Sequence, residues 1–315
     1  TQSIKRFFEK PEINVLLALI ALGIGLSFAS PFFLTARNIL NVLRQFSLIA
    51  ILAVGQGMII MTGGIDLSVG NVVGFTACFG AWVAKAGAPP LVALIAILGI
   101  GAVVGMTNGL LVTKVGIPPF IATLGMMSVA RGFSLLITMG VPISVEESWI
   151  TFFGGGYLGI VPVSVIVMLV IVGLGFLFAN NTVPGRNIYA VGNSEKAAKL
   201  SGIRVDRVKI MVFTITGILA GICGLILVGQ LEGADAFYGN GYELDVIAAA
   251  VIGGISLSGG EGNLLGILVG AALMGVLKNA FVLLAVPGYW QVVSIGVVII
   301  AAVSIDSLRR KGTAK

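Results

Sequence analysis

The residues that could carry out chemistry in this sequence are few and widely spaced. The chain contains no histidine, which is the commonest general base and the commonest metal ligand. Its two cysteines, Cys78 and Cys223, lie inside apolar segments, where a small buried side chain is the usual role. The phosphate-binding motif G-x-x-x-x-G-K-S/T of ATPases does not occur. We therefore expect no catalytic site and no metal or other cofactor in this chain.

The composition of the whole chain indicates whether water or lipid surrounds it. Hydrophobic residues make up 57% of the 315 residues and charged residues only 10%, with a mean hydropathy of +1.09. A soluble domain is roughly 25% charged, so this chain cannot cover a surface that faces water. Its 45 glycines are spread through the apolar segments, as close helix packing in membranes requires. The composition excludes a soluble enzyme, a disordered chain and a nucleic-acid-binding domain, and predicts an all-α, polytopic membrane protein.

The apolar segments predict about ten membrane-spanning helices in a single domain over residues 1–315. A helix needs ~20 apolar residues to cross ~30 Å of hydrocarbon. Segments that approach this length lie near residues 13–30, 46–62, 68–85, 91–112, 119–138, 160–180, 209–230, 244–257, 263–284 and 286–305. The eighth segment is short and two of the turns are only a few residues long, which leaves nine and eleven spans as alternatives.

Basic residues predict the orientation of these helices. Lys and Arg are concentrated in both terminal tails and in the segment 181–209, and Lys114 lies on the same side under a ten-span count. Because cytoplasmic loops carry an excess of Lys and Arg, we expect both termini in the cytoplasm. The net charge of +6 is then explained by topology and not by binding to nucleic acid.

Glycine-rich breaks interrupt the apolar segments at two places. The stronger break reads GGIDLSVG and includes Gly63, Gly64, Asp66 and Gly70. A near copy, GGISLSGG, occupies residues 253–260 and matches it at six of eight positions. Corresponding breaks in two halves are typical of internally repeated transporters, and coincidence in a glycine-rich chain is the alternative. We expect the first break to be a hinge for gating or a structural interruption.

Asp66 is the one acidic residue in the first break, and it directly precedes the third apolar segment. An aspartate there can cap the free N–H groups of a helix and meet the positive end of its dipole. Capping is the role that we expect. A charge-dependent role in gating is the alternative.

The segment 181–208 is the one predicted cytoplasmic loop that is long enough to fold by itself. Its Pro184-Gly185 pair predicts a turn. Asn193 or Ser194 is expected to cap a short helix that follows.

In this short helix Glu195 favours the first turn, and Gly202 suits the position just after the end. The helix would display Ala197, Ala198 and Leu200 among lysines. Such a surface suits either lipid headgroups or a groove on a partner protein.

Polar and aromatic side chains inside or at the ends of the apolar segments are candidates for a translocation pathway. Such groups recognise small polar solutes through hydrogen bonds and ring faces, and interhelical contact is the alternative role for each of them. The candidates are Asn41, Gln45, Gln56, Asn71, Phe75, Asn108, Thr123 and Gln291.

Two arginines lie on the side of the membrane where basic residues are rare. Arg37 and Arg44 are seven residues apart, so on a helix they share one face at the outer end of the second span. Contact with headgroups is one role for them. Docking to acidic groups of an external partner, where charge pairing sets orientation and on-rate, is the other.

Three stretches of the chain, in the same order, resemble one known family. They are GGIDLSVG in the first break, GRNIYAVGNSEKAAKLSGIRVDRVK from Gly185, and NGYELDVIAAAVIGGISLSGGEGNLLG from Asn240. They resemble the integral membrane permeases of bacterial ABC sugar importers of the ribose/xylose/galactoside type, over roughly residues 13–306.

The resemblance implies a type II ABC importer-like fold in the bacterial inner membrane, and a transport subunit that is not an enzyme. It implies a second permease copy, ATPase subunits that hold ATP and Mg, and a periplasmic binding protein that delivers a monosaccharide. It also assigns Glu195, Ala197, Ala198 and Gly202 to the loop that couples to the ATPase. The chain departs from the family pattern E-A-A-x-x-x-G by Lys196, which is inserted after the glutamate.

The source of energy separates two functions. A secondary transporter coupled to a proton or sodium gradient usually places several ionisable groups near the bilayer midplane. Here few candidates lie inside the apolar segments, namely Arg131, Lys278 and Asp245, and Asp66 lies at the boundary of one. We therefore expect an ATP-driven sugar permease, and an ion-coupled transporter of a small polar solute is the alternative.

Overall fold

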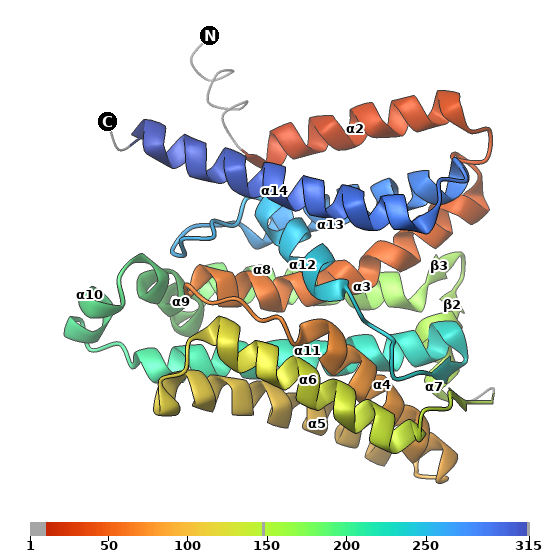
Figure 1. Ribbon diagram of the computed structural model, residues 1–315, viewed down its shortest axis with the longest axis horizontal. Helices are drawn as coiled ribbons and strands as arrows, with labels where there is room; N and C mark the ends of the chain where they lie inside the picture. The colour runs from red at the N-terminus through yellow and green to blue at the C-terminus, as the bar shows by residue number, and fades with distance from the viewer. Residues whose placement is uncertain (1–10, 147–148, 314–315) are drawn as a thin grey trace.

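Helices form almost all of the secondary structure, and most of them run along the long axis of the molecule (Figure 1). The computed structural model describes residues 11–146 and 149–313. The helices are α2 (Pro11–Ala29), α3 (Ala36–Met61), α4 (Val69–Lys85), α5 (Pro90–Leu110), the π-helix η1 (Leu111–Val115), α6 (Pro119–Thr138), α7 (Trp149–Gly155), α8 (Val163–Asn181), α9 (Val183–Asn193), α10 (Glu195–Leu200), α11 (Val205–Leu231), α12 (Tyr242–Ile252), α13 (Leu264–Leu283) and α14 (Gly288–Thr313).

Two small antiparallel ribbons lie in the connections. Strand β1 (Ile143–Ser144) pairs with β4 (Gly233–Ala234), with Ile143 opposite Ala234. Strand β2 (Tyr157–Leu158) pairs with β3 (Val161–Pro162).

Each of the ten predicted apolar segments contains a helix, but not all of these helices have the length of a span. Among the described residues, six helices are long and apolar enough to cross a membrane, and α2 and α14 contain shorter apolar stretches. Helix α12 has 11 residues. At 1.5 Å per residue it rises only about 16 Å, which is roughly half of the hydrocarbon thickness.

The second predicted span begins too late, because α3 starts at Ala36 and not near residue 46. Thr35 caps it, since its hydroxyl oxygen accepts a hydrogen bond from the Asn38 N–H at 3.4 Å. Polar residues such as Arg37 and Gln45 therefore lie in its first turns. They lower the local hydropathy without ending the helix.

The core of the bundle is α11, which packs against α5, α4, α7 and α3. Glycines four residues apart bring α5 very close to it. A Cβ atom added at Gly101 would overlap the carbonyl oxygen of Gly217, and one added at Gly105 would overlap that of Phe213. This contact confirms that the glycines serve close helix packing.

A loop that enters the bundle precedes α12. A Cβ atom at Gly70 would overlap the carbonyl oxygen of Gly239, and one at Gly74 would overlap that of Tyr238. The chain before α12 thus lies directly on the first turns of α4.

The two glycine-rich breaks begin in the same way. After α3 and after α12 a glycine adopts left-handed backbone, Gly63 with φ +81° and Gly254 with φ +94°. In both cases the next N–H donates to the carbonyl five residues earlier, at 3.1 and 3.0 Å, which closes the helix end. The repeated motif aligns Gly63 with Gly253, so the two turns are one residue out of register. The breaks then diverge, because α4 starts at Val69 whereas α13 starts only at Leu264.

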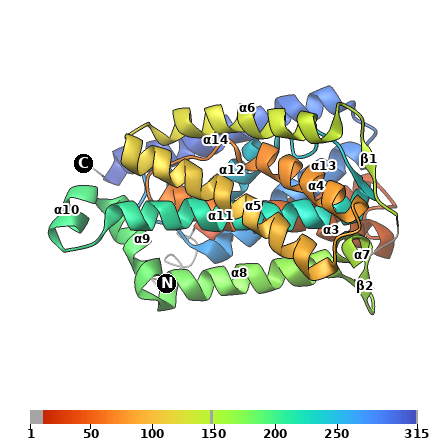
Figure 2. The same cartoon turned by 90° about the horizontal axis from the view of Figure 1, so that it is seen from below.

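The connections gather at opposite ends of the bundle. Helices α9 and α10 form one end, and α7 and the small ribbons form the other (Figures 1 and 2). The start of α2 and the end of α14 lie toward the end formed by α9 and α10 (Figure 1).

Candidate functional site

The segment between α8 and α11 folds into two short helices. Helix α9 begins after Thr182, whose hydroxyl oxygen accepts a hydrogen bond from the Gly185 N–H at 3.1 Å. The prediction of a turn at Pro184-Gly185 is wrong, because both residues lie in the first turn of α9. Proline is well suited to that position, where its missing N–H would have no helical partner.

Helix α10 confirms the predicted short helix. Its cap is Ser194, whose hydroxyl oxygen accepts a hydrogen bond from the Ala197 N–H at 3.2 Å. Glu195 begins the helix and forms an ion pair with Lys209 of α11, which fixes α10 against the following helix. Gly202 lies just after the helix and has φ +81°, so the change of direction there favours glycine.

The exposed face of α10 differs from the predicted one in one residue. Ala198 is buried, with 4% exposure, and it belongs to the main hydrophobic core. Ala197 is exposed, and Leu200 is 83% exposed. The surface that α10 offers to a partner is therefore formed by Ala197 and Leu200 together with Lys196 and Lys199, at the end of the molecule (Figure 2).

Four of the predicted pathway residues gather around the first break. Thr123 of α6 accepts a hydrogen bond from the Leu67 N–H at 3.1 Å, and the Asn71 side chain donates to the Met127 carbonyl at 3.1 Å. With its amide nitrogen turned toward the Asp66 carbonyl, Gln56 forms two hydrogen bonds of 3.2 Å with the Asp66 backbone. The break is thus held by polar side chains from α3, α4 and α6.

Asp66 is buried, and it does not cap α4 as predicted. The cap residue is Ser68. The Asp66 carboxylate accepts hydrogen bonds from the Ser68 N–H at 2.7 Å and from the Ser68 hydroxyl at 2.6 Å. The Ser68 oxygen in turn accepts from the Asn108 amide of α5 at 3.0 Å. Asp66 therefore stabilises the turn before the helix instead of the first helical N–H groups.

The other pathway candidates are scattered. The ring of Phe75 stacks on Phe133, with centroids 5.5 Å apart. Asn41 and Gln45 are exposed one turn apart on α3, and Gln291 is half-buried on α14. The structure thus joins Gln56, Asn71, Asn108 and Thr123 around the first break and leaves these four away from it.

The two outer arginines have different surroundings. Arg44 donates to the Gly155 carbonyl at 3.0 Å, and its guanidinium carbon lies 4.4 Å from the centroid of the Tyr157 ring. Arg37 is exposed. Of this pair, Arg37 is free to meet an external partner, whereas Arg44 fastens α3 to the segment around α7 and β2.

Most of the ionisable side chains inside the bundle form an ion pair or contact an aromatic ring. Lys278 of α13 forms an ion pair with Asp245 of α12, and Arg131 lies over the Phe237 ring at 4.7 Å. Glu243 is a buried carboxylate that sequence reasoning did not single out, and it faces Gly70. The described residues contain no cluster of three or more His, Cys, Asp or Glu that could hold a metal.

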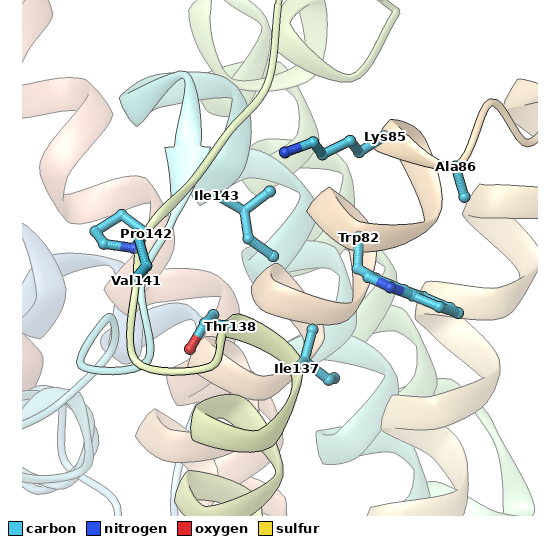
Figure 3. A pocket seen from close by; sticks show the side chains of 8 residues that line it. All are labelled: Trp82, Lys85, Ala86, Ile137, Thr138, Val141, Pro142 and Ile143. Atoms are coloured by element: carbon cyan, nitrogen blue, oxygen red, sulfur yellow. The ribbon is translucent and has the colours of Figure 1, made fainter.

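A surface pocket lies at the end opposite to α10. Figure 3 shows its lining residues, which are Trp82, Lys85, Ala86, Ile137, Thr138, Val141, Pro142 and Ile143. None of the predicted site residues lines it. The exposed surface of α10 and the polar cluster at the first break therefore remain the two candidate functional regions.

Comparison with known proteins extends over nearly the whole chain. Residues 38–303 match the family described as branched-chain amino acid transport system / permease component. The chain is 40% identical to the ribose import permease protein RbsC of Escherichia coli (strain K12) over 317 residues, covering 98% of this chain and 99% of that protein. It is 43% identical to the ribose import permease protein RbsC of Bacillus subtilis (strain 168), covering 94% and 92%.

A more distant relative has a different sugar in its name. The chain is 35% identical to the fructose import permease protein FrcC of Rhizobium meliloti over 312 residues, covering 96% of this chain and 85% of that protein. No solved structure matches the chain.

Proposed function

Since the chain belongs to the family described as branched-chain amino acid transport system / permease component, we propose that it is the membrane-spanning subunit of an ATP-driven importer for a monosaccharide. Its relatives are named as import permeases for ribose and fructose, which favours ribose or a related pentose or hexose here. The chain is a transport component and not an enzyme. The observation that carries the proposal is near full-length similarity to sugar permeases in a chain that has no phosphate-binding loop.

The proposal includes partners on both sides of the membrane. A cytoplasmic ATPase, which holds ATP and Mg, would bind the α10 surface, where Ala197 and Leu200 are exposed. A periplasmic binding protein would deliver the sugar at the opposite end, where Arg37 is free. Charge pairing with Arg37 would set the orientation and the on-rate of docking.

The resemblance to permeases of bacterial importers also supports a location in the bacterial inner membrane. We propose about ten spans with both termini in the cytoplasm and a type II ABC importer-like fold. The location of α9 and α10, the start of α2 and the end of α14 toward one end supports this orientation (Figure 1). The short helices α4 and α12 would be the incomplete spans of such a fold.

A second copy of the chain would complete the pathway. Arg37, Asn41 and Gln45 are spaced four residues apart on α3, and all three are exposed. Polar side chains on a membrane helix are costly to place against lipid, so they usually face the protein interior or a water-filled cavity. We therefore place this face of α3 on the pathway between two permease copies.

A competition assay tests the substrate class. Uptake of labelled ribose would be measured in cells that express the chain with its ATPase and binding protein, against an excess of unlabelled solutes. We expect pentoses and hexoses to compete and amino acids to leave uptake unchanged. Competition by amino acids alone would contradict the sugar assignment.

A further inference from the structure

The two glycine-rich breaks and the end of α9 meet at one place. The Gly260 N–H of the second break donates to the Met61 carbonyl at the end of α3, at 2.9 Å. A Cβ atom added at Gly192 of α9 would overlap both that Met61 oxygen and the Gly260 nitrogen. A Cβ atom at Gly259 would come within 3.2 Å of the Gly192 oxygen and the Gly63 nitrogen. We call these five residues the glycine junction.

Side chains of α9 bind the second break on both sides of this contact. The Tyr189 hydroxyl donates to the Gly262 carbonyl at 3.3 Å. Burial raises the pKa of this hydroxyl, which keeps it protonated as a donor. The Asn193 side chain lies so close to Gly260 that a Cβ atom there would overlap its Oδ1. The last turn of α9 is therefore fitted against the second break without space for a larger residue.

The junction is covalently next to the coupling helix. Gly192 is followed by Asn193 and then by Ser194, the cap of α10. Close-packed backbone contacts deform little, so a displacement at one side of such a contact must move the other side. A shift of α10 would consequently reach the end of α3 and the second break together, through Met61 and Gly260.

Resting on the proposed function, we propose that the glycine junction transmits movement of α10 on the ATPase to both glycine-rich breaks, with Gly192 and Gly260 as positioning residues for transport. The breaks are suited to receive this movement, because each contains a left-handed glycine, Gly63 and Gly254, at which the helix direction changes. The similar sequences of the two breaks would then reflect a shared mechanical role.

The first test is Gly192→Ala in the complex with the ATPase and binding protein, reconstituted in liposomes. The matched control is Gly173→Ala on α8, where an added Cβ meets open space. Because the α10 surface is unchanged, we expect Gly192→Ala to bind the ATPase as the control does. We expect sugar moved per ATP hydrolysed to fall at least about tenfold. Uptake per ATP equal to that of the control would overturn the proposal.

The second test does not depend on the folding of that variant. Ser258 in the second break is exposed, and the native Cys78 and Cys223 are buried, so Ser258→Cys can be labelled selectively with a fluorophore. In the otherwise unchanged complex, we expect the fluorescence to change when a non-hydrolysable ATP analogue binds the ATPase.

The outcomes separate this inference from the proposed function. A labelled complex that transports sugar with ATP but shows no fluorescence change overturns the role of the glycine junction alone. A complex in which even the unchanged chain shows no ATP-dependent uptake overturns the proposed function.

Discussion

Replacing Asp66 should reveal whether its role is hydrogen bonding or charge. Its carboxylate accepts hydrogen bonds from the Ser68 N–H at 2.7 Å and the Ser68 hydroxyl at 2.6 Å, and Ser68 is fully buried. Asparagine keeps the oxygen that accepts both bonds but carries no charge. Alanine removes the acceptor and leaves the Ser68 N–H buried without its partner.

The expected magnitudes follow from these contacts. A net hydrogen bond contributes about 1 kcal/mol, and a buried donor without a partner costs about 1–3 kcal/mol. Asp66→Ala should therefore lower the free energy of unfolding by about 2–4 kcal/mol, and Asp66→Asn by less than about 1 kcal/mol. For a chain of this size the alanine variant should unfold roughly 5–10 °C below the unchanged protein.

Two assays decide between hydrogen bonding and charge. Thermal unfolding in detergent measures the stability order, and uptake by the reconstituted importer measures transport. We expect Asp66→Asn to unfold near the unchanged protein and to transport nearly normally. An asparagine variant that inserts, assembles with the ATPase and fails to move sugar would refute the hydrogen-bonding account and show that the charge is required.

The exposed surface of α10 and the ion pair between Lys278 and Asp245 each support a further prediction. Ala197→Trp should prevent co-purification of the ATPase and leave the thermal stability of the chain unchanged, because Ala197 is exposed. Ala198→Trp should instead destabilise the chain itself, because Ala198 is buried. A normal yield of ATPase with Ala197→Trp would argue against docking at this face. Lys278→Met should lower the stability by about 3–5 kcal/mol, because it leaves the Asp245 carboxylate buried and unpaired. Adding Asp245→Asn should restore part of that loss in thermal unfolding, and a single variant as stable as the unchanged chain would contradict the pairing.

Local patterns were sufficient to predict the helical segments and the short helix α10. The apolar segments locate the helices because hydropathy is a property of consecutive residues, although it does not fix where each helix ends: α3 starts at Ala36, well before its predicted segment. Helix α10 is predictable for the same reason, since Ser194 and Gly202 set its two ends through their own backbone neighbours. The resemblance to sugar permeases, carried by three separate motifs, is confirmed by the near full-length similarity to ribose import permeases.

The features that sequence reasoning missed depend on distant contacts. Ala198 turns inward because it belongs to the main hydrophobic core, which the residues of α10 by themselves do not reveal. Helix α12 is short, as its apolar segment predicts, but the contact of the loop before it with Gly70 and Gly74, which come from a remote part of the chain, was not predicted. Asp66 binds Ser68 in place of capping α4, since the helix begins two residues later than a capping role for Asp66 requires. The repeated glycine motif pointed to the two breaks that form part of the glycine junction, but their contact with Gly192 is visible only in the three-dimensional structure.

The energy source of uptake tests the central claim most directly. Right-side-out membrane vesicles with the chain, its ATPase and its binding protein would be loaded with ATP or left empty, with and without an uncoupler of ion gradients. An ATP-driven importer predicts sugar uptake that requires internal ATP and is indifferent to the uncoupler. Uptake that proceeds without ATP and collapses with the uncoupler would contradict the account and identify an ion-coupled transporter.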